Sequence, residues 1–151
     1  MTRPASVLVT AGLLLGAAAW AQMPFKSPQS VRLGLSVMSQ VVANCGRLIA
    51  AGHYAEIPAQ ANELEAGIAS LQRGLGDQPQ PFESQLVPLI AQLRVASGAL
   101  REAATHHRES MLPVVRDQLA ETVQSIVALF PENLRPVAHG NPQPAGHANG
   151  G

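Results

Sequence analysis

The sequence predicts an all-α protein: an antiparallel up-down-up-down four-helix bundle built from two similar helical hairpins. Apolar residues recur at steps of three and four along four stretches, which is the pattern of helices that bury one face. Short segments rich in Gly, Pro or His separate these stretches. Aromatic residues make up only 3% of the chain, too few for the core of a β-sandwich or barrel.

The first 21 residues have the pattern of a signal peptide. Arg3 provides the positive charge, and the apolar run Val7–Ala19 is shorter than the ~20 residues of a membrane-spanning helix. Small residues in Ala19-Trp20-Ala21 suit a cleavage site. We expect cleavage near Ala21 and a periplasmic mature protein, since we find no second apolar span. An uncleaved N-terminal anchor is the alternative.

Length and charge restrict the function classes further. The 151 residues carry 10 basic and 10 acidic side chains, so there is no basic surface for nucleic acid. Without Arg3 the mature chain would have 9 basic and 10 acidic residues, a charge of −1. We expect one domain over residues 22–135 and a disordered Pro/Gly/His tail over 136–151. The single cysteine excludes an intramolecular disulfide.

The first hairpin is predicted from Pro28 to about Leu75. Ser27 can cap the first helix, Gly52 can end it near Ala51, and the second helix begins near Tyr54–Glu56. The first helix carries its apolar positions at Val31, Leu35, Met38, Val42, Cys45 and Ile49. The second carries them at Ile57, Ala61, Leu64, Ile68, Leu71 and Leu75.

The second hairpin is predicted from about Phe82 to Pro131. Pro88 should kink or shorten the start of its first helix, the turn lies at Thr105–Glu109, and Ser110 can cap the last helix. The apolar positions of its first helix are Leu86, Leu89, Leu93, Ala96, Leu100 and Ala103. Those of its second helix are Leu112, Val115, Leu119, Val123, Ile126 and Phe130.

The two hairpins look like copies of one unit. Pro58 and Pro113 align at an offset of 55 residues, as do the apolar positions that follow them. Gly46 and Gly98 align at an offset of 52. The difference predicts three extra residues in the second turn.

The stretches Ala51–Ile57 and Val127–Pro131, together with the hairpin lengths and the export pattern, resemble the cytochrome c′/cytochrome b562 class of periplasmic four-helix bundles. The Cys-x-x-Cys-His motif of the c-type members is absent, so covalent haem is excluded. The b-type members bind haem through a Met near the start of the first helix and a His near the end of the last. The resemblance therefore implies Met23 and His139 as candidate ligands of non-covalent haem b.

A second candidate site lies where the two hairpin turns should meet: His53, His106, His107 and Met111. Imidazole and thioether groups suit Cu, Ni or Co. The spacing of His107 and Met111 faintly resembles the His-x-x-x-Met element of periplasmic heavy-metal sensors, whose other His pair is absent here. The alternative is that these His side chains complement helix C-termini. Glu102 is placed to pair with His106.

Met38 and Cys45 lie seven residues apart and could bind a soft metal, although we interpret them as core residues. No catalytic motif is present. We therefore expect an exported non-catalytic binding protein, not an enzyme. The alternatives are a transition-metal binding or sensing protein, a b-type haem electron carrier, and a structural or chaperone-like protein acting through its helix faces on a periplasmic partner or as a homodimer.

Overall fold

The structure, a computed structural model, describes residues 24–137. This part of the chain is all-α, as predicted, and contains no strand. Its four long helices are α2 (Pro28–Ala51), α3 (Ile57–Leu75), α4 (Gln80–Thr105) and α5 (Leu112–Ala128). Three 3-10 turns accompany them: η1 (Tyr54–Glu56), η2 (Glu109–Met111) and η3 (Glu132–Leu134). The predicted signal peptide and nearly all of the predicted tail lie outside the described residues.

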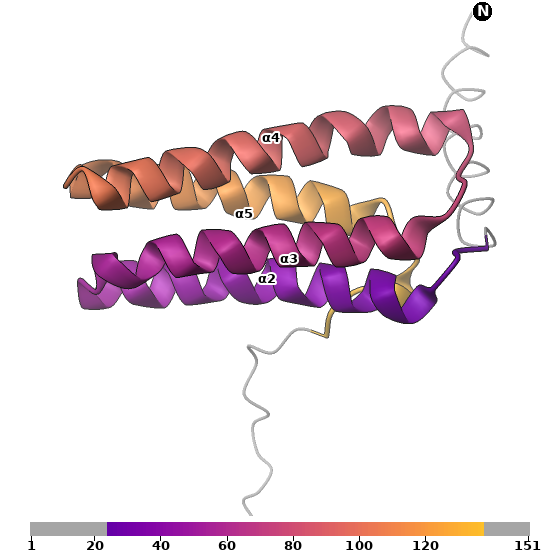
Figure 1. Ribbon diagram of the computed structural model, residues 1–151, viewed down its shortest axis with the longest axis horizontal. Coiled ribbons are helices and arrows are strands. Elements are labelled where there is room, and N and C mark those ends of the chain that lie inside the picture. Colours follow the sequence, from indigo (N-terminus) through magenta and orange to yellow (C-terminus); the bar gives the residue numbers. More distant parts are fainter. Residues whose placement is uncertain (1–23, 138–151) are drawn as a thin grey trace, which may run out of the picture.

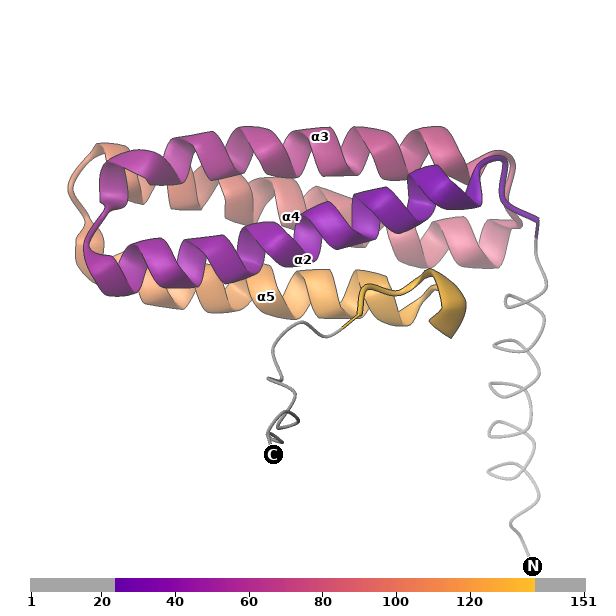
Figure 2. The same ribbon diagram turned by 90° about the horizontal axis from the view of Figure 1, so that it is seen from below.

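The four helices lie side by side along one long axis (Figure 1). α2 contacts α3 and α5, and α4 contacts the same two helices. The turns that contain η1 and η2 lie at one end of the molecule, and the α3–α4 connection lies at the other (Figure 2). The two hairpin turns are therefore neighbours, as the sequence predicts.

The caps of the first helix are confirmed. The Ser27 side chain accepts a hydrogen bond from the Ser30 backbone N–H at 3.2 Å. Gly52 has a φ of 75°, the left-handed conformation that glycine adopts without strain, and the next N–H, from His53, reaches the Leu48 carbonyl at 2.9 Å.

Two predictions for the second hairpin are corrected: Pro88 does not shorten the start of the helix, and Ser110 does not cap the last one. α4 begins at Gln80 and continues through Pro88. Proline removes the donor to the Ser84 carbonyl, but both residues are exposed and water can reach that carbonyl. Ser110 does not cap α5, because it lies within η2 and Met111 occupies the cap position without a side-chain hydrogen bond.

The core follows the predicted apolar faces, with local shifts. All six predicted α5 positions are 5% exposed or less. In α2, Val41 is buried and the predicted Val42 and Ile49 are half-buried; in α4, Ile90 is buried and Leu89 is half-buried. An α-helix has 3.6 residues per turn, whereas alternating steps of three and four average 3.5. The predicted apolar positions therefore drift around the helix, and at some turns the adjacent residue lies closer to the core.

α2 and α3 approach each other closely through glycine. A Cβ atom on Gly34 would lie 2.7 Å from the Gly67 carbonyl oxygen and 2.7 Å from the Leu71 backbone nitrogen. A Cβ atom on Gly74 would lie 2.6 Å from the Ser27 carbonyl oxygen. The contact between α2 and α3 is accordingly more extensive than the contact between α4 and α5, whose facing residues are larger.

The internal repeat has a uniform offset of 55 residues, which corrects the predicted insertion of three residues in the second turn. Gly52 and His107 both have positive φ, at 75° and 56°. The N–H of the following residue, His53 or Arg108, reaches a carbonyl five residues back, and a 3-10 turn then leads into the next helix. The buried α2 residues Val31, Leu35, Met38, Val41 and Cys45 correspond to the buried α4 residues Leu86, Ile90, Leu93, Ala96 and Leu100.

All three phenylalanines of the chain meet at the end opposite the hairpin turns. The ring centroids of Phe82 and Phe130 are 5.3 Å apart, and Phe25 lies 5.8 Å from Phe130 and 6.4 Å from Phe82. Phe25 belongs to the segment before α2, outside the helices that the sequence predicts. Gln78 holds this segment by donating to the Pro24 carbonyl at 3.2 Å.

α2 is long and apolar enough to cross a membrane, by length and composition alone. This corrects the expectation that no second apolar span exists. A signal sequence near the N-terminus and the core helix of a soluble protein have the same properties, so the finding is compatible with export. In the structure α2 buries Val31, Leu35, Met38 and Cys45 completely against the other helices, and 28% of its apolar window is buried.

Candidate functional site

The three predicted His ligands lie at the hairpin-turn end, but each pairs with its own carboxylate. His53 Nδ1 is 3.5 Å from Glu56, His106 Nε2 is 3.5 Å from Glu102, and His107 Nδ1 is 3.7 Å from Glu109. The His side chains are 62%, 58% and 87% exposed, so water screens these pairs. The predicted pairing of Glu102 with His106 is confirmed.

In the part of the chain that the structure describes, these His–carboxylate pairs stay separate from one another. Within residues 24–137, no group of three or more His, Cys, Asp or Glu side chains could hold a metal ion. The predicted thioether ligand, Met111, is 49% exposed. Metal binding by His53, His106, His107 and Met111 therefore stays a prediction from the sequence.

His107 has a role in the fold. It occupies the left-handed position that ends α4, and the Arg108 N–H beyond it reaches the Ala103 carbonyl at 2.8 Å. The same position in the first hairpin is Gly52, the residue type that adopts this conformation at the lowest cost. The spacing from His107 to Met111 is thus not helical, because the turn and η2 intervene.

Met38 and Cys45 are core residues, as interpreted from the sequence. Both are 0% exposed in the cluster formed by the four helices. Burial raises the pKa of the Cys45 thiol from 9.0 to about 11, and the nearby Arg116 guanidinium offsets part of this rise. A buried thiol with a high pKa is a poor metal ligand and a poor nucleophile at neutral pH.

The Cys45 thiol should make the protein less stable at alkaline pH. The pKa of the thiol is higher in the folded chain than in the unfolded chain. Its contribution to the free energy of unfolding is therefore complete below about pH 9 and is lost as the pH rises towards 11. The loss should reach about 2–3 kcal/mol near pH 11, measured by urea denaturation across this range. Cys45→Ala removes the titrating group and is the control. An equal alkaline loss in both proteins would show that the thiol is not responsible.

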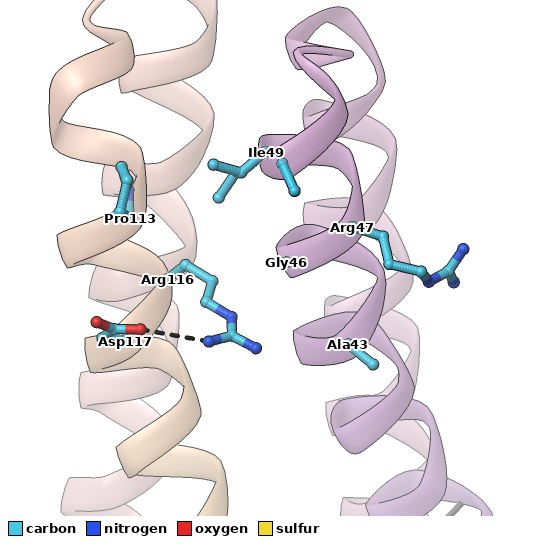
Figure 3. A pocket seen from close by; sticks show the side chains of 8 residues that line it. Ala43, Gly46, Arg47, Ile49, Pro113, Arg116 and Asp117 are labelled. Atoms are coloured by element: carbon cyan, nitrogen blue, oxygen red, sulfur yellow. Dashed lines mark hydrogen bonds and ion pairs between the residues drawn. The ribbon is translucent and has the colours of Figure 1, made fainter. Parts of the chain in front are cut away.

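A hollow of about 550 Å³ lies between α2 and α5, with Gly46 and Ile49 on one wall and Pro113 and Arg116 on the other (Figure 3). Arg116 extends towards Gly46, where an added Cβ would lie 3.0 Å from its Nη2. Its Nη1 pairs with Asp117 at 3.3 Å, and its buried Nε has no acceptor among residues 24–137. The Arg47 side chain points away from Arg116 in Figure 3, so the hollow presents one guanidinium that already has a carboxylate.

A second hollow, of about 490 Å³, lies between α4 and α5 and is mostly apolar. Its α4 wall includes Ala91, Val95 and Ala99, which follow one another at steps of four residues, and Val87 precedes them at the same step. We call these four residues the α4 stripe. All four are exposed, Val87 by 64% and Val95 by 73%. The α5 wall is polar: Gln118, Glu121 and Thr122.

The first hairpin has no such stripe. At the offset of 55, Val87, Ala91, Val95 and Ala99 correspond to Arg32, Ser36, Gln40 and Asn44. One copy of the repeat therefore has polar side chains where the other exposes apolar ones. Core-facing positions are apolar in both copies, so the difference is specific to the surface. The predictions from sequence did not include this stripe, although comparing the repeats at the correct offset would have shown it.

The candidate haem ligands Met23 and His139 both lie outside the described residues, so the haem hypothesis also stays a prediction. Comparisons of the chain with protein-family models, with curated proteins and with solved structures found no match.

Proposed function

We propose that the chain is an exported, non-catalytic binding protein that recognises a protein partner through the α4–α5 face of a helical bundle. The bundle would be of the cytochrome c′/cytochrome b562 type without covalent haem. The periplasm is the proposed compartment, following the signal-peptide pattern of residues 1–21. Metal binding at the hairpin-turn end and non-covalent haem are the alternatives, and neither gains support from the described residues.

The proposed topology is up-down-up-down. Short connections join α2 to α3 and α4 to α5, and short connections favour antiparallel neighbours. Each helix contacts the two helices that such a topology would place beside it. The faces of these helices, rather than an interior cavity, are then the surfaces available for binding.

The observation that carries the proposal is the α4 stripe. Scattered exposed apolar side chains are ordinary on protein surfaces, but an aligned row beside an apolar hollow is typical of an interaction site. Val87 and Val95 are mostly exposed, so these side chains contribute little to the core. A binding partner that covers the stripe would remove this apolar surface from water, at about 25 cal/mol per Å².

Site-specific photo-crosslinking tests this proposal. A photoreactive amino acid at Val95 should give a discrete protein adduct in cells that produce and export the chain. The matched control carries the same group at Gln40, the equivalent exposed position of the first hairpin. No adduct from Val95, or equal adducts from both positions, would contradict a docking face on the second hairpin.

A further inference from the structure

The order of residues along the α4 stripe indicates which kind of partner would fit this surface. From the N-terminal end the stripe reads Val87, Ala91, Val95, Ala99, a large and a small side chain in alternation. We infer that the stripe is the interface of a two-fold symmetric homodimer in which α4 packs antiparallel against α4 of a second copy. This inference rests on the proposed function, since it names the partner of the same face.

The stripe is complementary to itself when α4 of the second copy runs in the opposite direction. With the two-fold axis opposite residue 93, Val87 faces Ala99 of the second copy and Val95 faces Ala91 of the second copy. Residues at steps of four form a ridge inclined by about 26° to the helix axis, so the two stripes face each other when the reversed helices cross at about 50°. Every valine then lies against an alanine along the stripe. A parallel arrangement would place valine against valine and alanine against alanine. A two-fold interface requires this kind of self-complementary surface.

The charges of α4 are also compatible with this pairing. Arg94 forms a salt bridge with Glu65 of α3 at 3.2 Å, and Arg101 donates to Asn62 of α3 at 2.7 Å. Both guanidinium groups are therefore held on the α3 side of α4. In the reversed pairing the positions opposite Arg94, Arg101 and Glu102 are Gln92, Gln85 and Ser84, so no like charges face each other.

The surroundings of the stripe favour a second copy over an unrelated protein. The α5 wall of the hollow has two neutral side chains, Gln118 and Thr122, and one charge, Glu121. Association between different proteins commonly uses complementary charge to select the partner, whereas homodimer interfaces are more apolar and depleted in charge. The corresponding face of the first hairpin carries Arg32 and Glu63, at the positions of Val87 and Gln118.

The area of the α4–α5 face determines how tightly two copies are expected to associate. Val87 to Ala99 spans about 18 Å of helix, and two helices side by side are about 20 Å wide. Each copy therefore offers roughly 400 Å², or about 800 Å² in total, below the ~1,200–2,000 Å² of a typical stable complex. We expect a reversible dimer with a micromolar or weaker Kd.

Sedimentation equilibrium of the mature chain, from low micromolar to near-millimolar concentration, tests the dimer. The average mass should rise towards twice the chain mass. Val95→Asp would place a carboxylate against the Ala91 methyl group of the second copy and should weaken association by about 100-fold or more. Gln40→Asp, the equivalent change on the first hairpin, should leave it unchanged. Val95 and Gln40 are both exposed, so far-UV circular dichroism should show all three proteins equally folded.

Cysteine crosslinking tests the orientation. A mixture of Ala91→Cys and Val95→Cys chains should form a mixed disulfide faster than either chain alone, because the reversed helices place residue 91 opposite residue 95. Cys45 can stay in place because it is buried. Self-linking of Ala91→Cys faster than the mixed pair would overturn the antiparallel arrangement.

The outcomes separate the two proposals. Photo-crosslinking from Val95 to a species of twice the chain mass supports both. An adduct of another mass, with a monomer at all concentrations, overturns the homodimer and leaves the docking face. No adduct and no association overturn both.

Discussion

Replacing Gly34 by alanine should lower the free energy of unfolding by about 3 kcal/mol. The new methyl group would lie 2.7 Å from two backbone atoms of α3, the Gly67 oxygen and the Leu71 nitrogen. Backbone atoms cannot change rotamer, so α2 and α3 would have to separate along a contact that is otherwise close-packed. The cost should exceed the gain in helix propensity from glycine to alanine, which is at most about 1 kcal/mol.

Gly98→Ala is the matched control. Gly98 lies inside α4, and a Cβ atom there would meet no atom of the described residues within 4 Å. This substitution should raise the free energy of unfolding by about 0.5–1 kcal/mol, because only the propensity gain remains. Urea denaturation followed by far-UV circular dichroism measures both variants. A Gly34→Ala protein as stable as Gly98→Ala would contradict the close approach of α2 and α3.

Replacing Phe130 by alanine should cost about 3–5 kcal/mol. Phe130 is 1% exposed and contacts the rings of Phe82 and Phe25, so truncation removes a large apolar side chain and leaves a cavity beside two aromatic rings. A domain of this size has a total stability of about 5–15 kcal/mol. The variant should therefore be marginally folded, with a large fall in Tm.

Phe25→Ala is the comparison for this prediction. Phe25 is half-buried and precedes α2, so its loss should cost less than that of Phe130. Phe130→Leu should recover part of the stability lost in Phe130→Ala, because leucine refills much of the cavity. Thermal denaturation compares the three variants. A loss in Phe25→Ala as large as in Phe130→Ala would contradict the arrangement of the cluster.

Much of the fold could be predicted from the sequence because helix ends and buried faces have local causes. Ser27 before Pro28 specifies a helix start, and Gly52 specifies a helix end, through backbone hydrogen bonds within a few residues. The apolar positions of α5 recur at helical spacing and are all buried. The predicted turns also meet at one end, since short connections leave consecutive helices little choice of neighbour.

The candidate site was less predictable because side-chain proximity depends on the turn geometry. His107 and Met111 look like helical neighbours in the sequence, but α4 ends at Thr105 and the left-handed φ of His107 turns the chain before Met111. Each His then pairs with a carboxylate close to it in the chain. The four predicted ligands lie at the same end of the molecule, and among residues 24–137 no three His, Cys, Asp or Glu side chains form a group that could hold a metal ion.

The sequence by itself determined the all-α class, the approximate extent of each helix and the burial of Met38 and Cys45, because apolar spacing and capping residues act over one or two turns. Only the tertiary structure decided which glycines let α2 approach α3, and that the two hairpins match at a single offset of 55. It also decided that Val87 and Val95 remain in water. A helical residue faces the core or the solvent according to where the neighbouring helices lie, and no local pattern specifies that position.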